Sequence, residues 1–168
     1  EALANPLSTI KTLYFQDGFG AKRLGENTIK SADVIHALSP AWSSAKAPIQ
    51  KIVIGQEMAD EVVLAVQRSL NAPDSSIRSY KIHGISDEAL IDLGHKLKSP
   101  GGTLKTLELH VHPRLRHSPD AIMALAQGMN DKNCKLKAFE YTPQEQISAD
   151  TVAKLARAAS QNEHLASF

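Results

Sequence analysis

The sequence holds a single cysteine, few aromatic residues and no long apolar run. Because Cys134 stands alone, an intrachain disulfide framework and a metal site with several cysteine ligands are excluded. No apolar run approaches the roughly 20 residues that span a bilayer, and the first residues lack the charged-then-apolar order of a secretory signal. We therefore expect no membrane partner and a reducing compartment such as the cytoplasm.

The charge of the chain is balanced, with 19 lysine and arginine residues against 18 acidic residues and a net charge of +1. Most nonspecific affinity for nucleic acid comes from an excess of positive charge. Aromatic residues, on which the bases of a single strand stack, make up only 5% of the chain. These two shortages predict that nucleic acid is not the partner. One local basic cluster lies from His112 to His117.

The sequence does contain an internal repeat. An apolar residue is followed by a second one three positions later and by a third two positions after that, as in Leu104, Leu107 and Leu109. The pattern starts at Ile10, Ile49, Ile77, Leu104 and Leu136, and a partial unit starts at Leu165. Most of the intervals between units fall between 27 and 32 residues. Because side chains alternate along an extended chain, the last two apolar residues of each unit lie on one face of a strand.

A helix is predicted after each of these strands. The expected helices open at Ser31, Met58, Ser86, Ser118 and Ser148, where apolar residues begin to recur at helical spacing. Ser86, Ser118 and Ser148 are suited to cap the free amides of the first turn. A strand and a helix cannot bury their apolar faces within one unit, so neighbouring units must stack.

The stacked units predict an α/β fold, a solenoid in the shape of a horseshoe with a parallel sheet on the concave face and helices on the convex face. We expect a single domain over residues 1–168, with about five repeats cut from a longer array. The segments "LKTLEL", "IQKIVI", "IRSYKI", "LKAFEY" and "IKTLYF", with their helices, resemble the leucine-rich repeat family, in particular its ribonuclease-inhibitor-like subtype. The repeats are degenerate, because the usual asparagine or cysteine after the strand is absent from "GQEM", "HGIS", "HVHP" and "YTPQ".

The resemblance implies a module for protein–protein interaction, which binds an enzyme or a host protein through its concave face and rim. Proteins of this kind include inhibitors that cover the cleft of an enzyme, scaffolds, and effectors that bacteria deliver into host cells. The expected role is therefore that of an effector or an inhibitor, with the chain itself a monomer. The alternative is that the repeats choose the substrate of a larger enzyme whose catalytic domain lies outside this segment.

The candidate contact residues follow from the alternation of side chains between the two faces of each strand. Residues that alternate with the buried ones face the partner, so one column across the strands reads Tyr14, Val53, Lys81, Glu108 and Glu140, and the next reads Gln16, Gly55, His83, His110 and Thr142. We expect the partner to contact Tyr14, Lys81, His83, Glu108, His110 and Glu140 on the concave face, and Arg114 and Arg116 on the rim. A slip of one residue would exchange the two faces.

The sequence shows no pattern typical of catalysis or of a bound cofactor, so we expect neither enzymatic activity nor a cofactor. Glu108, His110 and His112, with His83 beside them, offer the ligands that zinc prefers. The same residue types are also what an exposed sheet face carries, and we favour that interpretation and expect no metal. Cys134 lies just before the fifth strand, where a buried structural thiol is expected rather than a nucleophile.

Overall fold

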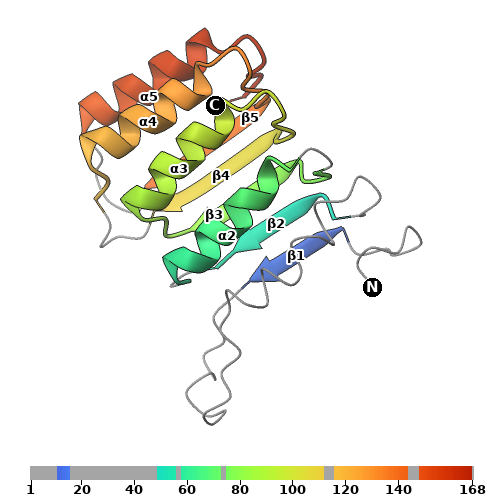
Figure 1. The fold of residues 1–168 in the computed structure, drawn as a ribbon. Helices are drawn as coiled ribbons and strands as arrows, with labels where there is room; N and C mark the ends of the chain where they lie inside the picture. The colour runs from blue at the N-terminus through green and yellow to red at the C-terminus, as the bar shows by residue number, and fades with distance from the viewer. Residues whose placement is uncertain are drawn as a thin grey trace.

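The computed structural model describes residues 11–15, 49–55, 58–72, 75–111, 116–143 and 148–167. Five parallel strands form one sheet in the order β1-β2-β3-β4-β5, so strands that follow each other in the sequence are neighbours in space (Figure 1). The strands are β1 (Thr12–Phe15), β2 (Lys51–Ile54), β3 (Ser79–His83), β4 (Thr106–Val111) and β5 (Ala138–Pro143). The helices are α2 (Asp60–Leu70), α3 (Asp87–Leu97), α4 (Pro119–Met129) and α5 (Ala149–Gln161).

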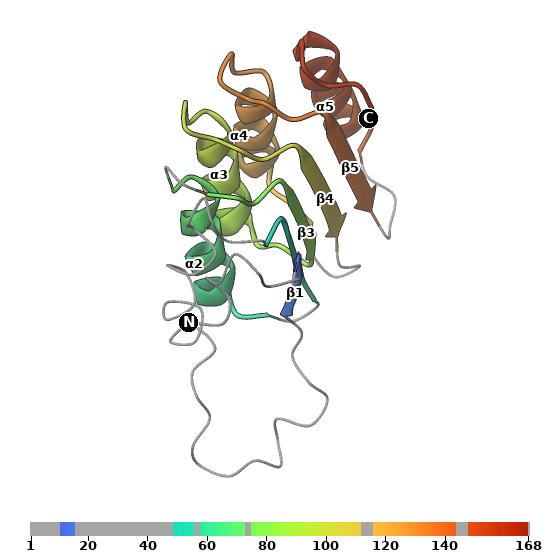
Figure 2. The same ribbon diagram turned by 90° about the vertical axis from the view of Figure 1, so that its right-hand side faces the viewer.

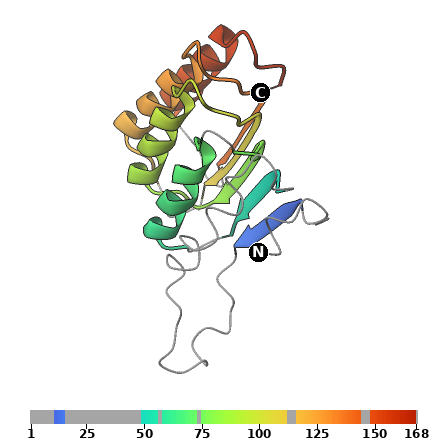
Figure 3. The same cartoon turned by 45° about the vertical axis from the view of Figure 1, so that its right-hand side comes forward.

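The four helices lie on one face of the sheet, and each runs beside the strand that precedes it (Figures 2 and 3). This arrangement confirms the predicted α/β class, the parallel sheet and the helices gathered on one side. None of the helices in the described ranges is long and apolar enough to cross a membrane. The predicted helix at Ser31 lies outside the described residues, and the prediction of a single domain stays a prediction.

The register of the strands follows the apolar pattern. Leu107 of β4 lies opposite Tyr80 of β3 and Phe139 of β5, and Leu109 lies opposite Ile82 and Tyr141. The side chains that face the helices in β3 and β4 are buried, because each is covered by its own repeat and by both neighbours. A strand shifted by one residue would place its polar residues in the core, so the alternation fixes the register.

Serine caps define where three of the helices begin. The side-chain oxygens of Ser86, Ser118 and Ser148 accept hydrogen bonds from the third following backbone amide, at 3.1–3.2 Å. Pro119 occupies the first position of α4, where its missing N–H has no helical partner to lose. The predicted caps are confirmed. Ala59 precedes α2 without a side-chain cap.

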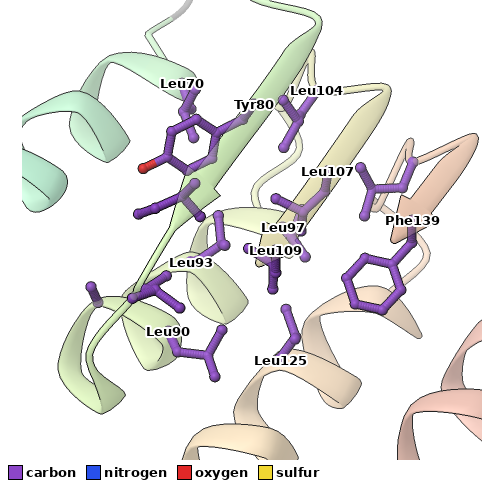
Figure 4. Packing of buried hydrophobic residues seen from close by; sticks show 14 of the residues in the cluster. Leu70, Tyr80, Leu90, Leu93, Leu97, Leu104, Leu107, Leu109, Leu125 and Phe139 are labelled. Atoms are coloured by element: carbon purple, nitrogen blue, oxygen red, sulfur yellow. The ribbon is translucent and has the colours of Figure 1, made fainter. Parts of the chain in front are cut away.

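One continuous apolar core fills the space between the sheet and the helices (Figure 4). Tyr80, Leu107 and Phe139 enter it from three successive strands, and Leu93 and Leu125 enter it from α3 and α4. No unit holds a core of its own, because each strand and helix packs against the next unit. The repeats therefore stabilise one another rather than folding separately.

The helices α3 and α4 touch backbone to backbone at two glycines. A Cβ atom at Gly94 would collide with the carbonyl oxygen of Ala124, and one at Gly128 would collide with the carbonyl oxygen of Gly94. Any larger residue at either position would push the two helices apart. This close approach sets the spacing between the third and fourth units.

Polar side chains tie neighbouring units together at two levels. At the start of the strands, the hydroxyl groups of Ser76 and Thr103 donate to the carbonyl oxygens of Ile49 and Ile77, at 2.6 and 2.8 Å. At the ends of the helices, three asparagine side chains donate hydrogen bonds to carbonyl oxygens at the end of a neighbouring helix. These residues are Asn71, Asn133 and Asn162. The asparagine or cysteine that the sequence lacks after its strands is thus replaced by hydrogen bonds made elsewhere in each unit.

Candidate interaction surface

The face of the sheet that points away from the helices carries the predicted contact residues, and we call it the open face. Tyr14 pairs with Val53, Val53 with Lys81, Lys81 with Glu108, and Glu108 with Glu140 in successive strand registers. The predicted column is therefore continuous across all five strands. In the second predicted column, His83, His110 and Thr142 are in register across β3 to β5, and Gly55 directly follows β2. Gln16 lies outside the described residues.

Glu108 is the centre of a charge cluster on the open face. Its carboxylate lies 2.9 Å from Lys81 Nζ on β3 and 3.5 Å from Lys51 Nζ on β2, so Lys51 reaches past an intervening strand. Burial raises the pKa of Glu108, but the hydrogen bond from Lys81 and the two positive charges outweigh it and hold that pKa below its usual value. The glutamate is charged at neutral pH and held in one place. Two cations flank Glu108, and Glu140 on β5 adds a second carboxylate in the same register.

Two histidines stack beside this cluster. The rings of His83 and His110 lie 4.6 Å apart between centroids, with 18° between their planes. Burial, the neighbouring His110 and the charge of Lys81 lower the pKa of His83, and Glu108 opposes them only in part. His83 is therefore neutral at neutral pH, and the stacked pair presents a flat ring surface next to the Glu108 cluster.

The two ends of the open face differ from its centre. Tyr14 on β1 is 72% exposed, whereas Val53 beside it is 9% exposed. On β5, Glu140 is exposed and accepts a hydrogen bond of 2.9 Å from the hydroxyl of Thr142. A partner that covers this face would meet an aromatic ring at one end, paired charges and histidines in the middle, and an exposed carboxylate at the other end.

The rim prediction is tested only in part. Arg116 is exposed, and Arg114 lies outside the described residues. His117, from the same basic cluster, has a side chain only 3% exposed and bonds through Nδ1 to Asp87 Oδ1 at 3.0 Å. Asp87 also accepts hydrogen bonds from the backbone amide of Ser118, so His117 and Ser118 join the start of α4 to the start of α3. His117 is thus a structural residue, unlike its exposed neighbour Arg116.

The zinc alternative gains no support from the geometry. Glu108 is engaged by two lysines, His83 and His110 stack instead of converging on one point, and His112 lies outside the described residues. Across the described ranges, no group of three or more histidine, cysteine or acidic side chains is arranged to hold a metal ion. Cys134 is 1% exposed, and burial raises the pKa of its thiol, as expected of a structural cysteine.

The prediction missed a second charged feature, a basic residue directly after the first apolar residue of most units. Lys11, Arg78, Lys105 and Lys137 all hold this position, and Gln50 holds it in the unit of β2. The basic residue recurs at this position of the repeat, but the net charge of +1 does not reveal it, because acidic residues elsewhere balance it.

Comparison with known proteins identifies the fold. No protein-family model matches the sequence, and no curated protein matches it by sequence. The C-terminal domain of tropomodulin from Caenorhabditis elegans has the same fold, with a TM-score of 0.63 and 13% identity over 95% of this chain and 88% of that one. Actin-binding site 2 of leiomodin-1 also matches, with a TM-score of 0.68 and 15% identity over 95% of this chain and 84% of that one. The fold is compatible with a leucine-rich-repeat-like architecture.

These matches correct the sequence-based family assignment. The ribonuclease-inhibitor-like subtype and the bacterial effector module were wrong, because tropomodulin and leiomodin domains are among the solved structures that share the fold. The physical reason is that the spacing of apolar residues and the serine caps are demanded by any stacked array of strands and helices. They specify how the units pack, and they carry no information about subtype or origin.

Proposed function

We propose that the chain is a protein-binding module that engages its partner through the open face of the sheet. One observation carries the proposal: five neighbouring outward positions are held in register, yet they carry tyrosine, valine, lysine and two glutamates. Packing demands repetition only on the face toward the helices. Varied side chains on a rigid surface are suited to recognise one particular partner.

The extent and rigidity of the surface support this role. Five strands about 4.8 Å apart span roughly 20 Å, which suits a protein interface of about 800 Å² per partner. Lys81 and Glu108 are already paired in the free protein, so little side-chain freedom remains to be lost when a partner binds. We further infer that the stacked units curve into a leucine-rich-repeat-like solenoid with this face on the inside.

Actin is the partner to test first, because leiomodin-1 uses a domain of this fold as an actin-binding site. A shared fold does not by itself transfer a function, so the test must involve the open face directly. Monomeric and filamentous actin would each be mixed with the native chain and with a Glu108→Lys/Glu140→Lys variant. Binding would be measured by sedimentation for filaments and by fluorescence anisotropy for monomers.

The control is a Glu61→Lys/Glu163→Lys variant, which reverses the same number of charges at two exposed positions away from the open face. Actin binding that weakens about tenfold in the open-face variant and little in the control would support both the module and the partner. Equal binding by all three chains would exclude the open face. No binding of actin by the native chain would remove actin as the partner.

An inhibitory role is a finer part of the same proposal. The open face would inhibit a partner if it covered the surface that the partner needs for its own activity. With actin, the rate of filament growth in the presence of the native chain and of the open-face variant would measure this effect. Binding without any change in that rate would argue for recruitment instead of inhibition.

A further inference from the structure

A column of basic side chains crosses the sheet where each strand begins. Lys11, Arg78, Lys105 and Lys137 occupy one equivalent position, with Gln50 in the unit of β2. The backbone shows the equivalence, because the carbonyl oxygen of each of these residues accepts hydrogen bonds from two successive amides of the next unit, at 2.7–3.2 Å. We call Lys11, Arg78, Lys105 and Lys137 the basic column.

Arg78, Lys105 and Lys137 of the basic column belong to successive units, and the guanidinium of Arg78 donates to the carbonyl oxygens of Ser75 and Ile77. Burial lowers the pKa of Lys105, and the positive charges of Lys137, Lys135 and Arg78 lower it further. Lys11, Arg78 and Lys137 are exposed. Within the described ranges, no acidic side chain forms an ion pair with any member of the column. Like charges on neighbouring strands are destabilising, so the free protein maintains an unfavourable arrangement that an anionic partner would relieve.

We propose that the basic column binds an acidic, extended segment of a partner protein that lies across the starts of the strands. Next to the column is a row of partly exposed side chains, in which Thr12, Ser79, Thr106 and Ala138 are small or carry a hydroxyl. Lys51 lies between Thr12 and Ser79 in this row, and its ammonium group is directed to Glu108. A chain could lie flat against this row. The column spans roughly 20 Å, which about six residues of extended chain would cover. The inference rests on the proposed function, to which it adds the chemistry of the partner segment.

A protein segment fits this surface better than a single-stranded nucleic acid does. Bases need aromatic platforms on which to stack, and Tyr14 is the exposed large aromatic residue among the described ones. Tyr14 belongs to the open face on β1, in a different row from the column. The net charge of +1 also limits nonspecific attraction to a polyanion.

The test uses a labelled peptide of alternating glutamate and serine, about twelve residues long, so that carboxylates on one side can meet the column. Binding to the whole chain would be measured by fluorescence anisotropy at low and at physiological ionic strength. Two variants would be compared. The column variant, Arg78→Gln/Lys105→Gln/Lys137→Gln, neutralises the three members of the column that belong to successive units and keeps Lys11. The other, Lys132→Gln/Lys154→Gln/Arg157→Gln, removes three positive charges elsewhere. A peptide of alternating glutamine and serine controls for the backbone.

The expected result is that the native chain binds the glutamate peptide, more weakly at higher salt, and that affinity falls about tenfold in the column variant and less than about threefold in the other. Neutralising the column should also leave the thermal midpoint unchanged or higher, because repulsion is removed. The proposal is overturned if the native chain does not bind the peptide or if both variants lose affinity equally. It is also overturned if an oligothymidylate of matched charge binds more tightly than the peptide.

The two proposals can fail separately. The Glu108→Lys/Glu140→Lys variant changes the open face and leaves the basic column intact, so it should still bind the glutamate peptide. If the native chain binds the glutamate peptide but not actin, actin is excluded as the partner and the proposal for the basic column stands. If actin binds the column variant as well as the native chain, and the native chain does not bind the peptide, the proposal for the basic column is rejected. The proposal of a protein-binding module then stands.

Discussion

The two faces of the same strands contrast in what they repeat. Toward the helices, β4 offers Leu107 and Leu109, and β2 and β3 offer Ile or Tyr at the same register, all buried. On the open face, the position between them changes from Val53 to Lys81 to Glu108. The first face is repeated because every unit must fit the same neighbours. The second varies because packing against the helices does not act on it, which leaves it available for a partner.

The difference between the two faces should be largest when adjacent residues of β4 are replaced. Leu107→Ala should reduce the free energy of unfolding by about 2–5 kcal/mol, because it removes a fully buried side chain and leaves a cavity. Glu108→Ala, one residue further on, should cost about 1 kcal/mol or less, since its lysine partners can return to water. Denaturation with urea, followed by circular dichroism, measures both. Similar losses in the two variants would contradict the division of roles between the faces.

A second test concerns the contact between helices. Gly94→Ala should destabilise the fold by about 1–3 kcal/mol, because the new methyl group meets the backbone of α4 and the helices must separate. The gain in helix propensity from glycine to alanine offsets only part of this loss. Gly101→Ala is the matched control, since the nearest atom to its Cβ would be 3.9 Å away. If thermal unfolding shows no difference between these two variants, the close approach of α3 and α4 is not required.

A helix cap gives a smaller effect. Ser118→Ala removes the hydrogen bond to the amide of Ala121 and should cost about 1 kcal/mol. Ser118→Asp should restore most of the stability, because a carboxylate can accept the same bond and favours the start of the helix dipole. The free energies of unfolding in urea would be compared for the native chain, Ser118→Ala and Ser118→Asp. An aspartate variant that is as unstable as the alanine variant would show that Ser118 matters for a reason other than capping.

Much of this fold could be predicted, because packing leaves a regular mark on the sequence. Strict alternation fixed the register, so that Lys81 lies opposite Glu108 as expected. Serine caps marked three helix starts. The reach of Lys51 past β3 to Glu108 could not be predicted, since it depends on the conformation of a long side chain. The burial of His117 was equally hidden, because its partner Asp87 lies 30 residues earlier in the chain.

The candidate surface was predicted less completely than the fold. The columns of the open face followed from parity, but the basic column was overlooked because the net charge of +1 averages it against acids elsewhere. The family was assigned wrongly for a related reason. Apolar spacing reports the demands of stacking, and stacking is common to many proteins of different descent and function.

The smallest expected effect is a pH dependence that arises on the open face. Burial, His110 and Lys81 hold the pKa of His83 below its ordinary value of about 6.5, so folding disfavours the protonated imidazole. The stabilising contribution is complete above about pH 6.5 and is lost as the pH falls through the lower pKa of the folded state. Unfolding free energies measured between about pH 5 and 8 should therefore fall on the acidic side. Above pH 5, Glu108 remains charged, since its own pKa is lowered.

Replacing His83 separates this effect from that of other histidines. His83→Gln should flatten the dependence on pH, whereas His95→Gln, at an exposed position on α3, should leave it as it is. His110→Gln should reduce the slope without abolishing it, because burial and Lys81 still act on His83. An unchanged slope in His83→Gln would show that other groups carry the pH dependence. A slope that disappears in both His83→Gln and His110→Gln would show that the contact with His110, rather than burial and Lys81, holds the pKa of His83 down.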